Sequence, residues 1–492
     1  MKAQIFICAF LLISLIGKAQ ITFDTTYDHN LNQEFGISIL LLPDSAYLCT
    51  VNSFNFATGN NQDLLLYKIK PTRNISFLTI LGEDSSYFYG GLPGSLIKLH
   101  DENYASCGTK VYYNNNSDGI YIKYDRIGNI VFYQLYHGGY QDALYNITET
   151  YDHGIVMIGY TTYYDSIQNK TTDDCLLMKV DSNGKVLWRK TFGGLEVDAG
   201  YSVHEISEKR LFISCLKKFA INNLVSWIII TDSIGNIIQE KEFNNSSLNC
   251  DAAFTTTSLD NQYFLWGCID TIINSNDYSS PAFIGKLDEN LNFVWKTIFN
   301  GPTLNGILNV RQLSDSSIVF VGGSYPYAWI GKLTKSGKMI WQKNFQHDTS
   351  PDNYFADFQQ TWDKGYIITG STNGPTGQDL WLVKLDSNGV LATDTFNTGT
   401  VMIDTKKPSF KAYPNPATDQ LYIEFNDGKN ETWHLIITDS YGRRVFKKNY
   451  TGNYVVEVPL NTLSNGIYFV QGILNGKSIN AQPVIIQKTI DP

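Results

Sequence analysis

The chain has little charge for its length, and the charge that it has is not clustered. Charged residues make up 17% of 492 positions, the net charge is −9, and no run of Lys or Arg occurs. This excludes the basic surfaces that bind nucleic acids or anionic membranes. With 43% hydrophobic residues, the chain is long enough to bury one large core and one smaller core, so we expect two folded domains.

Long apolar runs are also missing, except at the start. Lys2 precedes an apolar run from Ile5 to Ile16, and Gly17-Lys18-Ala19 places small residues where a signal peptidase cuts, so residues 1–19 are predicted to be a secretory signal cleaved after Ala19. Cys8 lies inside the run and not at its end, which argues against a lipoprotein. No other stretch approaches the ~20 apolar residues of a transmembrane helix, so no transmembrane segment is expected.

Cysteines are few and not arranged as metal ligands. Six remain after cleavage, with no CxxC pair and no Cys/His cluster, so no metal site and no cofactor are expected. Four lie in matching strands of successive repeats and are predicted to be small buried residues: Cys49, Cys107, Cys215 and Cys268. The compartment would permit disulfides, and Cys250 with Cys268 is the one pair that needs testing.

Catalytic signatures are absent. The sequence contains no HExxH, no GxSxG and no phosphate-binding Gly-Lys loop, and its seven His residues are scattered. No catalytic residue is therefore assigned.

Aromatic residues and glycine are abundant, at 14% and 39 residues, as many short strands with tight turns require. The stretch from Asp174 to Gly194 recurs with variations in seven copies. The copies align on one equivalent position each, which we call the anchor, and the anchors are Lys68, Lys123, Lys179, Ile230, Lys286, Lys332 and Lys384. The anchors lie about fifty residues apart, a spacing typical of propellers and other arrays.

Each copy contains four strand-like runs and a turn such as Asp181-Ser182-Asn183-Gly184. The Asp side chain is expected to bond nearby backbone N–H groups, and the Gly to take a positive φ. The likeness to a calcium loop is superficial, because the further acidic ligands do not follow. Seven sheets of four antiparallel strands bury their faces by radial stacking, so residues 20–396 are predicted to form a seven-bladed β-propeller.

Two details of the ring follow from the repeats. The fourth-strand aromatic residues are expected to pack between neighbouring blades, and they are Tyr133, Trp188, Trp295 and Trp341. Ile21–Tyr27 is similar to Leu391–Phe396 and is predicted to pair into the last blade as a closing clasp.

The repeats resemble those of secreted seven-bladed propeller proteins of Bacteroidetes. Asp379–Gly389 matches their D-x-W-L-V-K-L-D-x-x-G pattern, and Gly365–Gly370 matches their closing G-Y-x-x-x-G. The fourth copy departs most, with Ile230 for Lys and Asn244-Asn245 for the Gly pair. The resemblance implies a fold and no particular activity.

After a linker at 397–409, residues 410–492 contain alternating strands with turn glycines and are predicted to form a small antiparallel β-sandwich. They resemble the type A C-terminal sorting domain of the type IX secretion system in three motifs. The matching residues are Tyr413, Pro414, Asn415 and Pro416, then Asp439, Gly442 and Arg443, then Gly466, Ile467 and Tyr468. The resemblance implies recognition by the type IX machinery and a secreted or surface-attached protein; the alternative is an ordinary adhesion sandwich.

Repeated acidic residues were the remaining candidates for a site. Asp63, Asp118, Asp174 and Asp379 open the third strands, while Asp84, Asp142 and Asp198 follow the Gly-Gly turns or their equivalents. Equivalent positions form a ring on one face, where carboxylates at the channel mouth could bind a cation or sugar hydroxyls. The favoured alternative is structural: they cap strands and bond the backbone of the adjacent blade.

Two functions are compatible with these observations. The preferred hypothesis is a non-catalytic protein that binds a glycan, a protein or a matrix component through the loops Tyr112–Asn116, Tyr163–Lys170 and Asn274–Ser280. The alternative is a secreted glycan hydrolase or lyase that uses a carboxylate pair at the propeller mouth.

Overall fold

The structure is a computed structural model in two compact units, Met1–Ala392 and Thr393–Pro492. In the first unit it describes residues 22–28, 32–55, 61–83, 86–166, 169–194, 196–220, 223–243, 253–257, 263–268, 271–274, 277–279, 281–299, 305–347, 352–374 and 377–391. In the second it describes 409–426, 432–439, 443–451, 455–461, 463–474 and 477–488. The predicted signal, Ala19 included, lies outside these ranges.

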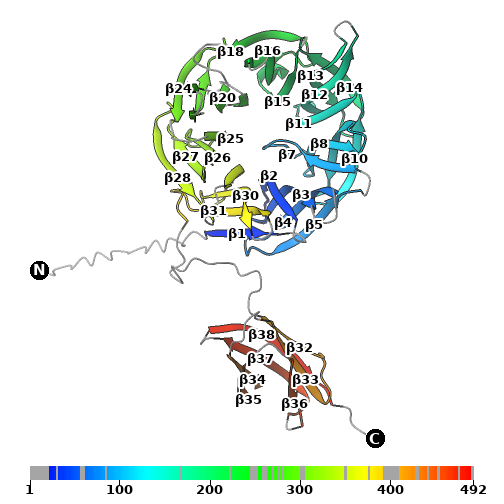
Figure 1. The fold of residues 1–492 in the computed structure, drawn as a ribbon, viewed down its shortest axis with the longest axis vertical. Helices are drawn as coiled ribbons and strands as arrows, with labels where there is room; N and C mark the ends of the chain where they lie inside the picture. Colours follow the sequence, from blue (N-terminus) through cyan, green and yellow to red (C-terminus); the bar gives the residue numbers. More distant parts are fainter. Residues whose placement is uncertain are drawn as a thin grey trace, which may run out of the picture. The chain divides into compact units, whose positions relative to one another are not determined.

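The first unit is a ring of antiparallel blades around a central opening (Figure 1), in which one parallel pair, Gln141 with Ser117, joins blades 2 and 3 into one sheet. Blade 1 contains β2 (Gln33–Leu41), β3 (Tyr47–Asn55), β4 (Asn61–Ile69) and β5 (Ile75–Leu81). In blade 2 a divided first strand, β6 (Ser86–Gly90) with β7 (Leu96–Lys98), precedes β8 (Tyr104–Tyr112), β9 (Ser117–Tyr124) and β10 (Ile130–Tyr136). Blade 3 contains β11 (Gln141–Glu149), β12 (Ile155–Asp165), β13 (Lys170–Val180) and β14 (Val186–Phe192).

Blade 4 contains β15 (Asp198–Glu205), β16 (Leu211–Ala220), β17 (Asn223–Thr231) and β18 (Ile237–Phe243), with a 3-10 turn η1 (Ser207–Lys209). Blade 5 contains β19 (Ala253–Thr257), β20 (Tyr263–Cys268), β23 (Ala282–Leu287) and β24 (Phe293–Phe299), with the added hairpin β21 (Thr271–Asn274) and β22 (Asp277–Ser279). Blade 6 contains β25 (Asn305–Gln312), β26 (Ile318–Ser324), β27 (Tyr327–Leu333) and β28 (Met339–Phe345).

Blade 7 contains β29 (Tyr354–Gln360), β30 (Tyr366–Gly374), β31 (Gly377–Leu385) and, as its outermost strand, β1 (Phe23–Tyr27). The register runs from Phe23 opposite Lys384 to Tyr27 opposite Leu380. The predicted closing clasp and the seven-bladed propeller are therefore confirmed. The likeness to Leu391–Phe396 cannot be followed, because residues from 392 on lie outside the described ranges.

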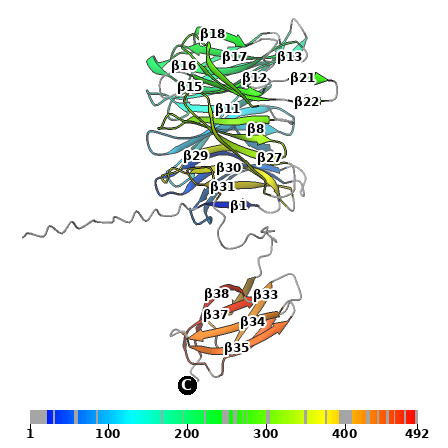
Figure 2. The ribbon, with the colours of Figure 1, turned by 90° about the vertical axis from the view of Figure 1, so that its left-hand side faces the viewer.

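Antiparallel order gives the ring two different faces. The turns between strands 1 and 2 and between strands 3 and 4 lie on one face, here called the turn face. The hairpins between strands 2 and 3 and the blade-to-blade connections lie on the other, here called the hairpin face. The ring is edge-on in Figure 2, where the β21–β22 hairpin projects on one side.

The repeated turn chemistry has the predicted form. Asp181 Oδ1 accepts the N–H groups of Asn183 and Lys185 at 2.9 Å each, and Gly184 has φ of 82°. The same carboxylate-to-backbone pattern recurs at Asp125, Asp232, Asp288 and Asp386. The turn carboxylates therefore close hairpins, as predicted.

Fourth-strand tryptophans pack on the turn glycine of the next blade, as predicted for three of the four aromatic residues. A Cβ on Gly235, Gly337 or Gly389 would lie 3.0, 2.5 or 2.7 Å from the ring of Trp188, Trp295 or Trp341. In blade 2 the prediction of Tyr133 was wrong, because the Tyr133 side chain is 40% exposed. Phe132 takes the place of the tryptophan there: a Cβ on Gly184 would lie 3.3 Å from the edge of its ring. Like the three tryptophans, Phe132 lies opposite the anchor lysine of its blade.

The core of the ring lies between blades, in interfaces that we call seams. One buried cluster joins Val156, Ile158 and Leu177 of blade 3 to Val203 and Trp227 of blade 4, among others. Burying such aliphatic and aromatic groups contributes roughly 1.5–3 kcal/mol per side chain. The anchor lysines act within a blade: Lys179 Nζ lies 2.7 Å from Asp152 Oδ2 in the first turn.

Buried cysteines pack in these seams. Cys49, Cys107, Cys175 and Cys215 are free thiols with no exposed surface, which confirms the prediction for three of the four named cysteines. Cys175 Sγ and Cys215 Sγ lie 3.1 Å apart across the blade 3–4 seam. Cys250 and the side chain of Cys268 lie outside the described parts, so their pairing is not tested.

The second unit is the predicted antiparallel β-sandwich. One sheet has the order β32 (Ser409–Tyr413), β33 (Gln420–Asn426), β36 (Val455–Pro459). The other has the order β35 (Arg444–Thr451), β34 (Thr432–Asp439), β37 (Gly466–Leu474), β38 (Lys477–Ile486). Their inner faces share one core around the fully buried Trp433. In the described parts of the chain, no helix is long and apolar enough to cross a membrane.

Candidate functional site

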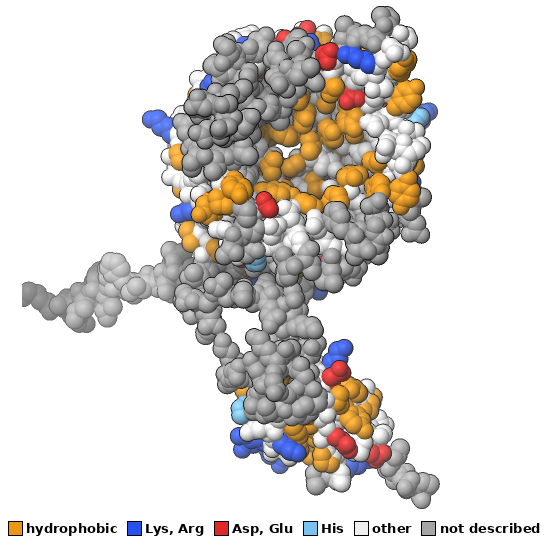
Figure 3. Space-filling model, in the orientation of Figure 1, with side chains coloured by type: hydrophobic (Ala, Val, Ile, Leu, Met, Phe, Trp, Pro, Cys, Tyr) orange, Lys and Arg blue, Asp and Glu red, His pale blue; other side chains and the backbone are white. Residues whose placement is uncertain are grey.

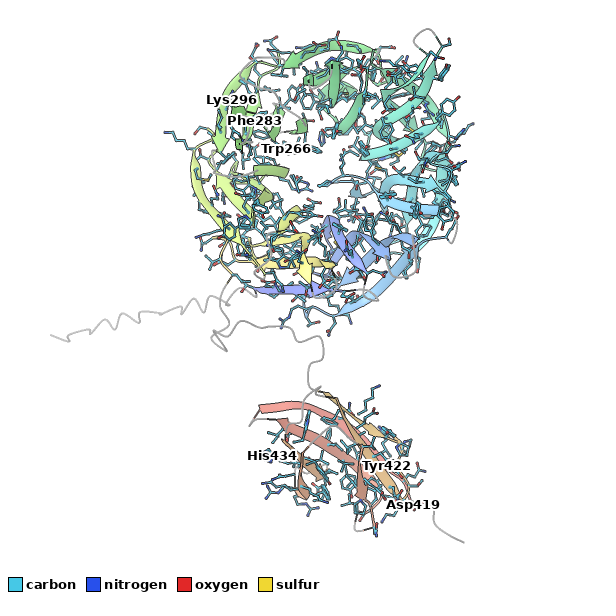
Figure 4. All side chains as sticks on the ribbon, in the orientation of Figure 1. Trp266, Phe283, Lys296, Asp419, Tyr422 and His434 are labelled. Carbon is cyan, nitrogen blue, oxygen red and sulfur yellow. The ribbon has the colours of Figure 1, made fainter. Side chains whose placement is uncertain are left out.

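The Tyr-Pro-Asn-Pro motif of the second unit fastens its first segment to its last strand. Asn415 Oδ1 accepts the N–H of Ile485 at 2.8 Å. Ala417, just after the motif, donates to Ile485 O and accepts from Gln487 N, both at 2.8 Å. Tyr413 is 40% exposed, and its ring centre lies 6.0 Å from that of Tyr422, which Figure 4 labels near one end of the sandwich. The motif thus holds the first segment of the sandwich against its last strand and leaves the Tyr413 side chain exposed.

The other two motifs combine buried anchors with exposed groups. Arg443 donates to Asp439 from its backbone N at 2.9 Å and from Nε at 2.8 Å, while most of its side chain is exposed. Tyr468 is buried and donates to Ser464 O at 3.0 Å, whereas its neighbour Ile467 is 52% exposed. Gly442 lies outside the described residues. The exposed residues of the three motifs are Tyr413, Pro414, Asn415, Pro416, Arg443, Gly466 and Ile467. Of these, Tyr413, Arg443 and Ile467 offer a partner the largest side chains.

In the propeller, the four third-strand acids do not lie on the strands that line the opening. Asp63, Asp118, Asp174 and Asp379 stand at the hairpin-face ends of β4, β9, β13 and β31. Each of these strands is separated from the channel by two strands of its blade, about 10 Å at the usual strand spacing. The structure brings these acids into the seams.

In the seam between blades 2 and 3, the two carboxylates are paired with an arginine, a histidine, a hydroxyl and backbone N–H groups. Asp118 accepts from Tyr112 OH at 2.7 Å and lies 2.8 Å from His137 Nδ1. Asp142, fully buried, accepts the N–H groups of Gly138 and Gly139 and pairs with Arg189 Nη2 at 2.6 Å. Asp118, His137 and Asp142 each place one ligand-type atom within 4.8 Å of the others.

Asp174 and Asp198 meet at the equivalent seam of blades 3 and 4. A Cβ on Gly193 would lie 2.2 Å from Asp174 Oδ1 and 2.8 Å from Asp198 Oδ2. Asp198 accepts Gly194 N at 2.7 Å. Burial raises the pKa of Asp174, against the hydrogen bond from Tyr163. The structural hypothesis is confirmed for Asp142 and Asp198, while Asp84 lies outside the described residues.

The closing seam, between blades 7 and 1, holds three carboxylates. Asp28, Glu34 and Asp379 each place one oxygen within 4.8 Å of the other two. Burial, and then the nearby Asp28, raise the pKa of Asp379 to about 7. Sequence reasoning singled out Asp379 but missed Asp28 and Glu34, which lie outside the repeated acid positions that it compared.

A ring of side-chain hydrogen bonds around the opening was also missed. In most blades a polar residue follows the bulge of the first strand and bonds the first strand of the next blade. Asn146 accepts Val203 N at 3.2 Å, and Asp357 accepts Ile39 N at 3.1 Å. The same position in other blades carries Ser38, Ser202 and Asn309. The signal was present as a polar residue within each otherwise apolar first strand.

Hydrophobic side chains surround the central opening (Figure 3). On the side of blades 3 to 5, ring centres form a chain from Tyr160 to Tyr145 at 5.7 Å, Tyr201 at 5.8 Å, Phe254 at 5.4 Å and Trp266 at 6.2 Å. Figure 4 labels Trp266 beside the opening. The wall is therefore aromatic in this sector.

Four exposed tyrosines lie at the hairpin-face ends of blades 2 and 3, and together we call them the tyrosine patch: Tyr113, Tyr140, Tyr163 and Tyr164, which are 54%, 56%, 37% and 47% exposed. Tyr163 and Tyr164 are consecutive in β12 and therefore point to opposite faces of their sheet. Gln141 Nε2 donates to Asn115 O at 2.8 Å, and Tyr140 N donates to Thr162 O at 2.9 Å. The connection that carries Tyr140 is thus held between the two hairpins. Two of the three loops predicted to contact a ligand, Tyr112–Asn116 and Tyr163–Lys170, supply the other members.

A hollow of about 250 Å³ lies on the turn face. In it the ring of His100 stacks on that of His153, with the ring centres 4.2 Å apart, and two acidic residues lie nearby. Both acids have structural partners: Asp101 pairs with Lys123 at 2.7 Å, and Glu149 accepts His100 N at 2.7 Å. The hollow therefore offers no free acid–base pair.

Comparisons with known proteins identify the second unit. Residues 411–487 match the family model described as "Secretion system C-terminal sorting domain". No curated protein sequence matches the chain. Among solved structures, a protein of unknown function from Bacteroides caccae is 10% identical, with 66% of this chain and 98% of that chain covered and a TM-score of 0.36. A catalytically inactive virginiamycin B lyase from Staphylococcus aureus is 11% identical (74% and 100% covered, TM-score 0.44), and Drosophila Semaphorin 2a is 8% identical (94% and 99% covered, TM-score 0.40). At these scores the fold assignment rests on the pairing of the strands.

Proposed function

The C-terminal unit is a type IX sorting domain and the protein is secreted or surface-attached, and we propose that its propeller is a non-catalytic module that binds an extracellular glycan. The observation that carries the proposal is the tyrosine patch. Exposed aromatic side chains clustered on one face are typical of interaction surfaces, because tyrosine has a flat apolar ring and a polar hydroxyl.

The chemistry around the patch favours a sugar. Asn114, Asn115 and Asn116 lie in the turn beside Tyr113, and Gln141 follows Tyr140. Amide side chains carry both donors and acceptors, which suits sugar hydroxyls, and the flat rings suit the apolar faces of pyranoses. Lys170, at the end of the loop that carries Tyr163 and Tyr164, is paired with Glu196 at 3.0 Å, which weakens the case for a polyanion.

Glycan cleavage, the alternative, needs two carboxylates about 5–10 Å apart that both reach the substrate. Glu34 and Asp379 are nearly fully buried, so they do not reach a polymer at the surface. Asp142 is buried and forms an ion pair with Arg189. The acids of these seams thus favour structural or cation-binding roles over acid–base catalysis on a polymer.

We also propose that the chain matures by cleavage after Ala19, that the propeller occupies 20–396 and the linker 397–409, and that the domain at 410–492 is the part that the type IX machinery contacts. Exposed Tyr413, Arg443 and Ile467 support such a contact. N-terminal sequencing of the exported protein tests the first boundary, because it should begin at Gln20.

Binding is tested by affinity electrophoresis of the purified chain against a panel of neutral and acidic polysaccharides. We expect at least one neutral polysaccharide to retard it, and Tyr113→Ala or Tyr164→Ala to weaken the retardation about tenfold, or about 1.4 kcal/mol. Tyr151→Ala is the matched control, since Tyr151 is 73% exposed on the turn face. Equal effects at Tyr151 and Tyr113, or no retardation by any polysaccharide, would contradict the proposal.

A further inference from the structure

The closing seam gathers three carboxylates from the parts of the chain that close the ring. Asp28 directly follows the clasp β1, and Asp379 lies next to its last partner, Leu380. Glu34 lies in the first strand of blade 1. One oxygen from each of the three residues lies within 4.8 Å of the other two. Carboxylates repel at this distance unless a proton or a cation lies between them.

Two buried oxygen atoms at this seam point to a ligand, and one of them, in Asn32, lies outside the carboxylate cluster. Asp379 is 4% exposed, and among the described residues its Oδ1 has no hydrogen-bond partner. Asn32 is 6% exposed, and its Oδ1 likewise has no partner in the described parts. Asn32 Nδ2 donates to Ser53 Oγ, which donates to Glu34 Oε1, both at 3.0 Å. The Asn32 amide is therefore held next to the cluster.

We propose that the closing seam binds one divalent cation of the calcium type through carboxylate oxygens of Asp28, Glu34 and Asp379, with Asn32 Oδ1 as a fourth ligand. All four donors are hard oxygen atoms, which suit calcium and disfavour zinc or copper. Magnesium binds less well in a site built largely of protein ligands, because it retains its waters and requires strict octahedral geometry.

The bound cation ties three parts of the ring together. It links the end of the clasp, the first strand of blade 1 and the third strand of blade 7, where, among the described strands, segments from opposite ends of the unit close the ring. Because the cation binds only the closed ring, it stabilises the folded state by mass action. The site is independent of the tyrosine patch, which lies on blades 2 and 3.

The test is a thermal unfolding series on the full chain, stripped with EDTA and then titrated with CaCl₂ or MgCl₂. At 100 times the dissociation constant, calcium should raise the midpoint of the propeller by about 3 °C, and magnesium by less. Calorimetric titration should give one calcium per chain.

Variants decide which residues bind the ion. Asp28→Asn changes an exposed side chain and leaves the core intact, and Asp379→Asn tests the buried ligand; each should weaken calcium binding at least tenfold. Asp118→Asn, at the seam of blades 2 and 3, is the matched control and should keep the full shift. An unchanged wild-type midpoint in calcium, or a full shift in both Asp28→Asn and Asp379→Asn, overturns the proposal.

Discussion

Two seams of the ring differ in the groups that surround their buried carboxylates. Between blades 2 and 3, the first-strand Asp142 is paired with Arg189 at 2.6 Å, and the third-strand Asp118 lies 2.8 Å from His137 Nδ1 and accepts from Tyr112 OH. Between blades 7 and 1, Glu34 and Asp379 are joined by a third carboxylate, Asp28. An internal seam can thus be balanced by the fold itself, whereas the closing seam concentrates negative charge where the two ends of the unit meet.

The largest effect is expected from removing the clasp. Deletion of Thr22–Asp28 removes the outermost strand of blade 7 and the buried Phe23. We expect a loss of about 5 kcal/mol or more, because a buried Phe alone is worth about 3–5 kcal/mol. Chemical denaturation measures it. A synthetic peptide of residues 22–28 added in trans should recover part of the loss; an unchanged midpoint on deletion would show that the clasp does not close the ring.

The next largest effect is expected at the balanced seam. Arg189→Ala leaves the fully buried Asp142 without its cation, and breaking such a pair costs about 3 kcal/mol. The double variant Arg189→Met with Asp142→Asn should recover much of this, because neither charge then remains. Urea unfolding of the three proteins separates the outcomes: a double variant no better than the single one would contradict the electrostatic account.

A smaller, pH-dependent effect is expected at the seam of blades 4 and 5, where a neutral histidine, His204, hydrogen-bonds from one blade to the other. His204 Nε2 donates to Thr255 O at 2.6 Å, and burial lowers the pKa of His204 to about 4. Because the folded pKa lies below the unfolded value near 6.5, this contribution is complete above pH 6.5 and is lost as the pH falls towards 4.

We expect a loss of roughly 1–2 kcal/mol over that window, discounted because the His204 side chain is only partly buried. His204→Gln should flatten this part of the stability curve, measured by urea midpoints from pH 7 to pH 4. A variant curve that keeps the wild-type slope would show that another group is responsible.

Much of the architecture was accessible from the sequence because it repeats. The period, the turn Asp and Gly residues and the tryptophans at Trp188, Trp295 and Trp341 all recur, so each copy supports the assignment of the others. The error at Tyr133 was a one-residue misalignment: the aromatic residue opposite Lys123 is Phe132, after an irregularity in pairing that the residue pattern does not reveal. A one-residue slip exchanges the two faces of a strand.

The candidate sites were less accessible because they depend on what does not repeat. Asp379 was identified as one of a set, but Asp28 and Glu34 become its neighbours only when the ring closes. The partners of Asp142 depend on Arg189 reaching across the blade. The tyrosine patch needed the connection that carries Tyr140 to be placed between two hairpins.

By itself, the sequence determined the number of blades, the clasp, the β-sandwich and its sorting motifs, because local turn chemistry and strand periodicity are written in contiguous residues. Only the tertiary structure decided which carboxylates meet, which of them are balanced and where exposed aromatic side chains gather. Electrostatic and packing contacts act across space between residues that the chain separates, so closing the ring creates neighbours that no local pattern contains.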